Sequence, residues 1–141
     1  MFFIALSLFF AIFVAVKTDG TTIAKGHWGE DLACAMLLDE GATIRERNWR
    51  SGHLEIDIIA AKDDILIFAE VKTRADLNID PLEAIDKRKQ QNMVRAAVHY
   101  MGAFGREFGC RFDYFAINGT PDSYHIEHLP DAFSPTMLEF S

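Results

Sequence analysis

The chain has 141 residues, half of them apolar and a quarter charged, which suits one compact domain whose body is globular rather than disordered. Its formal net charge of −7 argues against tight binding of nucleic acid over the whole surface, because proteins that bind in this way are usually basic. Basic residues gather locally, however, so a nucleic-acid site confined to one part of the domain stays open.

The first sixteen residues (MFFIALSLFFAIFVAV) are almost continuously apolar. As a helix they would reach roughly 24 Å, which is short of the ~30 Å hydrocarbon core of a bilayer. They also lack the basic start and the cleavage site of a secretory signal. The alternatives are a short membrane anchor, a poor signal peptide or a start codon assigned too early, and we favour the last. We therefore expect a leader over 1–20, a domain over 21–141, and a cytoplasmic protein that is membrane-anchored only if the leader is retained.

The domain is expected to open with a helix over about 23–39. Apolar side chains recur there at four-residue spacing, at Trp28, Leu32 and Met36. Gly41 stands where a helix C′ glycine belongs. Thr43–Trp49 then reads as a short, partly exposed strand, and Leu54–Ala61 and Ile65–Thr73 read as a hairpin.

The second half is expected to begin with a helix from Pro81, capped by Asp80, that runs to about Tyr100 or Ala103. Strands follow over Arg111–Ile117 and Tyr124–Leu129. The order α-β-β-β-α-β-β predicts an α/β fold, a mixed sheet flanked by helices.

The hairpin carries the residues with the strongest chemical pattern. Alternation along a strand puts Glu70 and Lys72 on one face, and Glu55 and Asp57 on one face of the strand before it. A turn of two or four residues sets Asp57 opposite Glu70 and Glu55 opposite Lys72. Facing Cβ atoms are then ~5 Å apart, so the two carboxylates can share one ion.

Two carboxylates held this close repel each other unless a proton or a cation lies between them. Oxygen ligands favour Mg²⁺ or Mn²⁺, and a lysine on the same strand can activate water or stabilise charge at an attacked phosphodiester. The alternative is a solvated face with weak cross-strand ion pairs. Asp57 and Glu70 lie in apolar runs, however, where charges are uncommon without a purpose.

The segments Gly29-Glu30, Glu55-Ile56-Asp57 and Glu70-Val71-Lys72 resemble the PD-(D/E)XK nuclease superfamily, also called restriction-endonuclease-like. Within it the chain is similar to the YraN-type bacterial family, related in fold to archaeal Holliday-junction resolvases. The similarity runs over about 24–135. It also includes Arg47–Arg50, Ala96-Ala97, Arg111–Asp113, Ile126–Leu129 and Asp131–Phe133.

The resemblance implies a role for each matching residue. Asp57 and Glu70 would be metal ligands, Lys72 the catalytic lysine, and Glu30 a further acid and metal ligand from the first helix. For Glu30 the alternative is a helix-surface carboxylate. Glu55 would be a salt-bridge partner of Lys72 or a structural residue.

The function that these features predict is a Mg²⁺- or Mn²⁺-dependent nuclease that hydrolyses phosphodiester bonds in structured or branched DNA rather than RNA. Candidate nucleic-acid contacts are Arg47, Arg50, Arg74 and Lys89. Lys89 falls at helical spacing with Ile85, Met93 and Tyr100, so one alternative is that it leans toward the site. We favour the other, a stem that covers apolar surface while its ammonium stays in water. A homodimer would suit a four-way junction by analogy of fold. The alternative function is a non-catalytic nucleic-acid-binding or accessory interaction module on the same fold.

The remaining metal-binding residue types predict no further site. Cys34 and Cys110 are far apart in the sequence, and we expect two free thiols rather than a disulfide. The five histidines include no pair at the spacing of a helical zinc site.

Overall fold

A computed structural model describes residues 27–75, 85–104 and 109–134. The expected leader, and with it the boundary between 1–20 and 21–141, lies outside these residues. Among the residues described, no helix combines the length and apolar character that crossing a bilayer requires.

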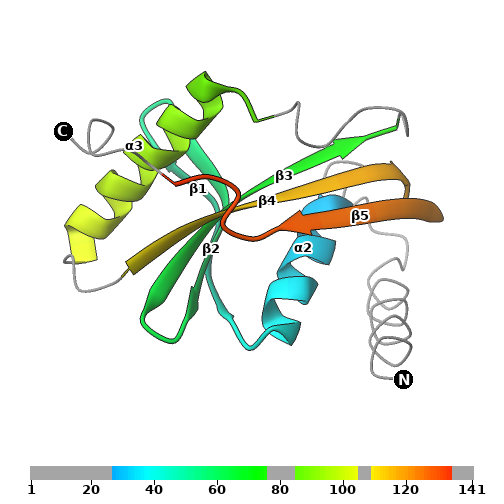
Figure 1. Ribbon diagram of the computed structural model, residues 1–141, viewed down its shortest axis with the longest axis horizontal. Helices are drawn as coiled ribbons and strands as arrows, with labels where there is room; N and C mark the ends of the chain where they lie inside the picture. The colour runs from blue at the N-terminus through cyan, green and yellow to red at the C-terminus, as the bar shows by residue number, and fades with distance from the viewer. Residues whose placement is uncertain (1–26, 76–84, 105–108, 135–141) are drawn as a thin grey trace.

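A five-stranded sheet forms the centre of the domain, with the strands side by side in chain order. Neighbouring strands run antiparallel except for the third and fourth, which are parallel and are joined through a helix. The elements are α2 (Trp28–Asp39), β1 (Thr43–Ser51), β2 (Leu54–Lys62), β3 (Ile65–Arg74), α3 (Lys87–Phe104), β4 (Gly109–Thr120) and β5 (Ser123–Leu129). This order confirms the predicted mixed α/β fold. Figure 1 shows α2 and α3 on opposite sides of the sheet.

Each face of the sheet has its own apolar core. On the α3 side, helix residues such as Met93, Ala97 and Tyr100 pack on Ile59 and Phe68. The core on the α2 side is built by Ala33, Cys34, Leu37, Ile58, Ala60, Ile67, Ala69 and Phe115, with Ala42. Neither Cys34 nor Cys110 forms a disulfide, as expected, and Cys34 is buried whereas Cys110 is half-buried.

Helix α2 lies unusually close to the sheet at its first turn. A Cβ on Gly29 would overlap Thr73 Oγ1 of β3 and come within 3.0 Å of Ile117 Cδ1 of β4. Only a glycine therefore lets the helix approach this far, and the approach brings the next residue, Glu30, to the sheet. At the other end Gly41 has φ 96°, which confirms the predicted C′ glycine.

Helix α3 begins at Lys87, so the predicted start at Pro81 is wrong for the described part of the chain, in which residues 85–86 are not helical. Asp80 and Pro81 themselves lie outside the described residues. The cap is Asp86, whose carboxylate Oδ1 accepts the backbone N–H of Lys89 at 2.8 Å. An aspartate three residues before an unpaired N–H is the favoured N-cap geometry, and it fixes the helix start here.

The hairpin register is the one predicted. The turn is Asp63-Asp64, with Asp63 at φ 54°, and Lys62 pairs with Ile65 and Ile58 with Ala69. The pairing of β2 with β3 ends there, one residue before Asp57 and Glu70 would meet. Beyond that point β2 stays paired with β1 and β3 with β4, so the sheet divides between β2 and β3.

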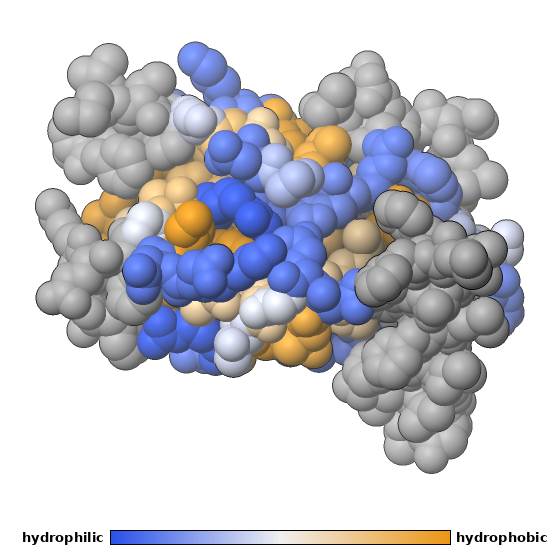
Figure 2. Space-filling view, turned by 60° about the horizontal axis from the view of Figure 1, so that its bottom comes forward, coloured by the Kyte–Doolittle hydropathy of each residue, from blue (hydrophilic) through white to orange (hydrophobic). Residues whose placement is uncertain are grey.

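The surface of the described residues is mixed in polarity. Figure 2 shows one side of the molecule, where hydrophilic residues form a continuous band and apolar residues appear in patches between and beside it. The large apolar side chains that are strongly exposed are Leu38 at 50% and Ile65 at 42%. Scattered exposure of this kind is ordinary for a folded domain.

The first prediction concerns Gly29. Gly29→Ala should lower the free energy of unfolding by about 2 kcal/mol, because the added methyl group forces helix α2 away from Thr73 and Ile117. Gly102→Ala is the matched control, since a Cβ there meets nothing within 4 Å and alanine favours a helix. Urea unfolding followed by circular dichroism measures both. Equal stability of the two variants would show that the close approach of α2 is not needed.

Candidate active site

Asp57 lies where β2 separates from β3, and its side chain takes the place of a strand partner. Its Oδ2 accepts the backbone N–H of Val71 at 2.8 Å. Ile56 belongs to the core on the α3 side and Ile58 to the core on the α2 side. Regular alternation would put both on one face, so the strand is irregular at Asp57. The predicted common face of Glu55 and Asp57 is therefore not what the structure has, and Asp57 is directed into the gap.

The carboxylates of Asp57 and Glu70 meet across this gap. Burial is the largest cause that raises the pKa of Asp57 to about 7, and the neighbouring charge of Glu70 is the next. A hydrogen bond to Val71 N–H opposes the rise, while a hydrogen bond with Glu70 adds to it. At neutral pH the Asp57 carboxyl is therefore protonated in part of the molecules. The facing arrangement predicted from the hairpin is present.

Lys89 reaches the same pair from α3. Its Nζ lies 2.9 Å from Glu70 Oε1, and the Glu70 side chain is only 14% exposed. Burial lowers the pKa of Lys89, but the carboxylates of Glu70, Asp57 and Glu55 more than offset it, and the pKa is raised. The favoured interpretation, an ammonium left in water, is therefore wrong: the side chain is half-buried and ion-paired.

Glu30 is close to the gap but is held by residues of its own side of the sheet. Its Oε2 accepts the Asn48 amide at 3.1 Å and lies 3.2 Å from His27 Nδ1. The guanidinium of Arg47 lies 3.6 Å from the same oxygen of Glu30 and 2.8 Å from the carboxylate of Asp31. Asn48 has φ 52° and occupies the β1 position opposite Asp57, which the β1–β2 pairing skips.

The three predicted metal ligands are thus brought to one region without forming a single cluster. Within the described residues, no group of three or more acidic, histidine or cysteine side chains is arranged to hold a metal ion. The arrangement has one close pair, Asp57 with Glu70. Glu30 is a neighbour whose charge contributes to the raised pKa of Asp57.

The other predicted site residues lie around this pair. Lys72 is exposed on β3, two residues after Glu70 and on the same face. Glu55 is also exposed and lies 3.6 Å from Arg50 rather than against Lys72. Arg74 is half-exposed near Tyr114, the β4 neighbour of Glu70. Burial raises the pKa of Tyr114 to about 12, so its phenol stays neutral beside the site.

Comparison with known proteins gives the family. A model described as "Uncharacterised protein family UPF0102" matches residues 29–117. The chain belongs to the UPF0102 family. That range holds every predicted catalytic residue, and it agrees with the YraN-type resemblance of the sequence.

Curated UPF0102 relatives cover most of the domain. A UPF0102 protein of Bacteroides thetaiotaomicron is 43% identical over 114 residues, which are 80% of this chain and 94% of the relative. One of Chlorobium chlorochromatii is 41% identical over 125 residues, 84% of this chain and 97% of the relative. One of Rhodococcus jostii is 44% identical over 114 residues, 79% and 97% respectively.

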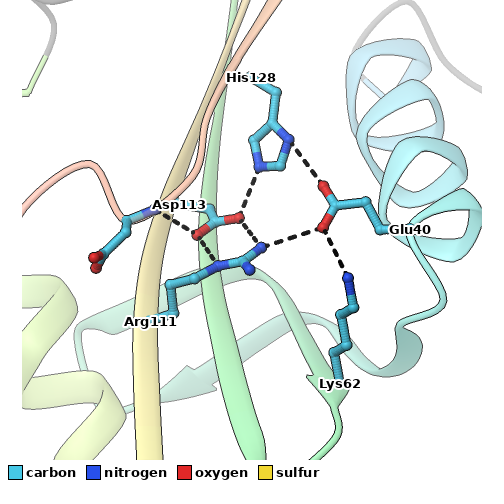
Figure 3. A network of polar contacts seen from close by, with 6 residues as sticks. Glu40, Lys62, Arg111, Asp113 and His128 are labelled. Atoms are coloured by element: carbon cyan, nitrogen blue, oxygen red, sulfur yellow. Dashed lines mark hydrogen bonds and ion pairs between the residues drawn. The ribbon is translucent and has the colours of Figure 1, made fainter.

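A second polar cluster of this UPF0102 chain lies at the opposite end of α2. We call it the Asp113 network; it comprises Glu40, Lys62, Arg111, Asp113 and His128 (Figure 3). Asp113 is fully buried, and its carboxylate receives two hydrogen bonds from Arg111 and one from His128, each at 2.7 Å. The backbone N–H of Asp131 donates a fourth at 3.0 Å.

The Asp113 network joins four parts of the chain: the end of α2, β2, β4 and β5. His128 of β5 stacks on Phe115 and lies 3.2 Å from Glu40, just after α2, while Lys62 of β2 lies 4.0 Å from the same carboxylate. Burial raises the pKa of Asp113, but hydrogen bonds from His128, Arg111 and Asp131 outweigh it, and the pKa is lowered. Of these residues, the resemblance included only Arg111, Asp113 and His128, and the sequence analysis assigned none of the five a role. The signal that was available is an aspartate inside the apolar run of β4.

The second prediction tests the strained carboxylate pair. An aspartate whose pKa is raised on folding favours the folded state most at low pH, and this contribution is lost as the pH rises from about 4 to about 7. Asp57→Asn keeps an acceptor for Val71 N–H and removes the repulsion. Without metal it should raise the free energy of unfolding at pH 8 by on the order of 2 kcal/mol and flatten its pH dependence.

Thermal melts between pH 5 and pH 8.5 measure this effect. Glu55→Gln is the control, because Glu55 is exposed and pairs only weakly with Arg50. If Asp57→Asn follows the wild-type pH dependence throughout, the two carboxylates do not repel each other as described.

The third prediction concerns the Asp113 network. Asp113→Ala should destabilise the fold by about 3 to 5 kcal/mol, because it leaves the half-buried Arg111 charge with only the more distant carboxylate of Glu40, at 3.5 Å. The control is Glu127→Ala on β5. Glu127 lies 3.7 Å from His125, and both side chains are exposed, so its loss should cost less than about 1 kcal/mol. Chemical unfolding at pH 7 compares the two. Similar losses for both would mean that the network does not anchor β5.

Proposed function

We propose that this UPF0102 chain is a metal-dependent nuclease of the PD-(D/E)XK type, hydrolysing phosphodiester bonds with Mg²⁺ or Mn²⁺. The observation that carries the proposal is the pair of half-buried carboxylates, Asp57 and Glu70, which face each other where β2 and β3 separate. Two acids pressed together in this way, with the pKa of Asp57 raised to about 7 and one ammonium, that of Lys89, beside Glu70, form a site that would attract a divalent cation.

The donor set suits a hard divalent cation. Carboxylate oxygens are the preferred ligands of Mg²⁺, which keeps several waters and is commonly held by only one or two carboxylates together with substrate phosphate. A pair therefore suffices, and a third protein ligand is not required. When bound, the ion would polarise a phosphate oxygen and lower the pKa of a coordinated water.

The surrounding residues have distinct tasks in this proposal. Lys72, exposed on the same face as Glu70, would hold an attacking water or stabilise charge on the phosphate as it is attacked. Asp57 would be held in place by Val71 N–H, so that its free oxygen faces the ion. Glu30, fixed by Asn48 and Arg47, would orient ordered water at the edge of the site.

The substrate we propose is DNA of structured or branched form. The binding surface would be local, because the net charge of −7 opposes a broad electrostatic grip. Of the predicted contacts, Arg50 is 71% exposed and Arg74 is half-exposed, which leaves both near solvent. Arg47 is bound to Asp31 and Glu30, so we assign it to support of Glu30 instead.

The fourth prediction is direct cleavage. With Mn²⁺ or Mg²⁺, the full chain should cut at least one of a four-way junction, a flap, a duplex, a single strand and an RNA, and chelation should stop it. Asp57→Asn, Glu70→Gln and Lys72→Met should each lower the rate at least ~100-fold, because each removes a group that acts on the reacting phosphate. Glu55→Gln is the matched control and should keep activity.

Loss of activity must be separated from loss of fold, and Asp57→Asn is suited to this because it is expected to be more stable than the wild type. A stable variant without activity supports the proposal. If no substrate is cut by wild type with either metal, the alternative of a non-catalytic nucleic-acid or accessory module stands. The acidic balance of the chain is the observation that favours that alternative.

A further inference from the structure

Lys89 is delivered to the carboxylate pair by a well-defined piece of backbone. Asp86 caps α3 by accepting the N–H of Lys89 at 2.8 Å, and its carbonyl accepts the N–H of Gln90 at 3.1 Å. The first turn of the helix is thereby fixed. Met93, one helical turn further on, is buried in the core on the α3 side. Lys89 therefore extends the buried stripe of α3 toward the gap between β2 and β3.

The ammonium of Lys89 sits where a cation is needed. It lies 2.9 Å from Glu70 Oε1, and its pairing offsets part of the charge that Asp57 and Glu70 bring together. Its side chain is 39% exposed, so a lysine stem with four methylene groups has room to swing outward. The pair is thus a contact that can be exchanged for another cation without disturbing the helix.

A divalent ion on Glu70 and an ammonium at hydrogen-bond distance from the same carboxylate oppose each other. The divalent ion and the ammonium would then lie within about 5 Å of each other, and at this distance their repulsion stays substantial even in water. The two cations therefore compete for Glu70. The ammonium of Lys89, when it is paired with Glu70, weakens binding of the metal ion, and a bound metal ion weakens the pairing of Lys89 with Glu70 by the same free energy.

We propose that Lys89 is an internal counter-ion that holds Glu70 in the metal-free protein and competes with the divalent metal for it. Lys89 is in this sense a positioning residue: it keeps the carboxylate pair in place and sets the metal affinity, and it leaves Glu70 when the ion binds. The inference rests on the proposed metal site, and it adds a regulator of that site drawn from helix α3, which packs on the face of the sheet that carries Glu70.

The test is Mn²⁺ binding by calorimetry on the full chain at pH 8, above the pKa of Asp57. Lys89→Met and Lys89→Gln remove the charge and keep most of the stem, so both should bind Mn²⁺ roughly tenfold more tightly than the wild type. Lys89→Arg keeps the charge and should bind like the wild type. Lys87→Met, on the exposed first position of α3, is the matched control and should change nothing.

A double variant, Asp57→Asn with Lys89→Met, locates the effect. The gain in affinity should disappear in it, because the ion then lacks one of its two carboxylates. A merely structural role of Lys89 would lower stability without tightening metal binding, and thermal melts without metal record this separately.

The outcomes separate this inference from the proposed function. If the wild type binds Mn²⁺ and Lys89→Met and Lys89→Gln bind it no more tightly, the competition is refuted and the two-carboxylate site stands. Binding by the neutral variants alone supports the competition in its strongest form. If neither wild type nor these variants bind Mn²⁺, the competition is refuted, whereas the metal-dependent function is tested separately by the cleavage assay, in which substrate phosphate can complete the metal site.

Discussion

The division of the sheet between β2 and β3 is the constraint on which the rest of the domain depends. Pairing stops at Ile58 and Ala69, and the next backbone donor, Val71 N–H, is satisfied by a side chain instead of a strand. A buried donor needs a partner, so the carboxylate of Asp57 is drawn into the gap and is held beside Glu70. The repulsion between the Asp57 and Glu70 carboxylates destabilises the fold, and the packing of the two apolar cores, one on each face of the sheet, offsets it.

Helix α2 connects the two polar regions of the chain. Its first turn lies close to β3 through Gly29 and carries Glu30, and its last residue precedes Glu40 of the Asp113 network. A helix of 12 residues spans roughly 18 Å and does not bend easily. The buried aspartate at one end therefore fixes the angle at which the helix reaches the candidate site at the other. The two carboxylates differ in their pKa accordingly. Hydrogen bonds from His128, Arg111 and Asp131 lower the pKa of Asp113, whereas burial and the charge of Glu70 raise the pKa of Asp57.

Much of this architecture could be predicted from the sequence, because it follows from local rules. The order of elements, the C′ glycine at Gly41 and the hairpin register all come from periodicity and turn chemistry, and the register alone set Asp57 against Glu70. The start of α3 was misplaced because a proline after an aspartate reads like a cap, whereas Asp86 makes the actual bonds. The helical spacing of Lys89 allowed it to lean toward the site, and Asp113 stands out in an apolar run, but their actual partners lie in distant segments and depend on the tertiary fold. The break in alternation at Asp57 arises from the divided sheet and is likewise a tertiary effect.

The irregularity of β1 has a consequence for how copies of the chain meet. β1 is an outer strand, and an outer strand normally offers its free backbone groups as a template for pairing with another molecule. Here the register of the β1–β2 pairing shifts between Ile44 and Glu46. Further along the strand, Asn48 has a left-handed backbone conformation with φ 52°. Arginines and a glutamate alternate along the same stretch. A strand with two interruptions and dense charge is a poor template, so this margin of the sheet resists fibril-like stacking and edge-to-edge self-association.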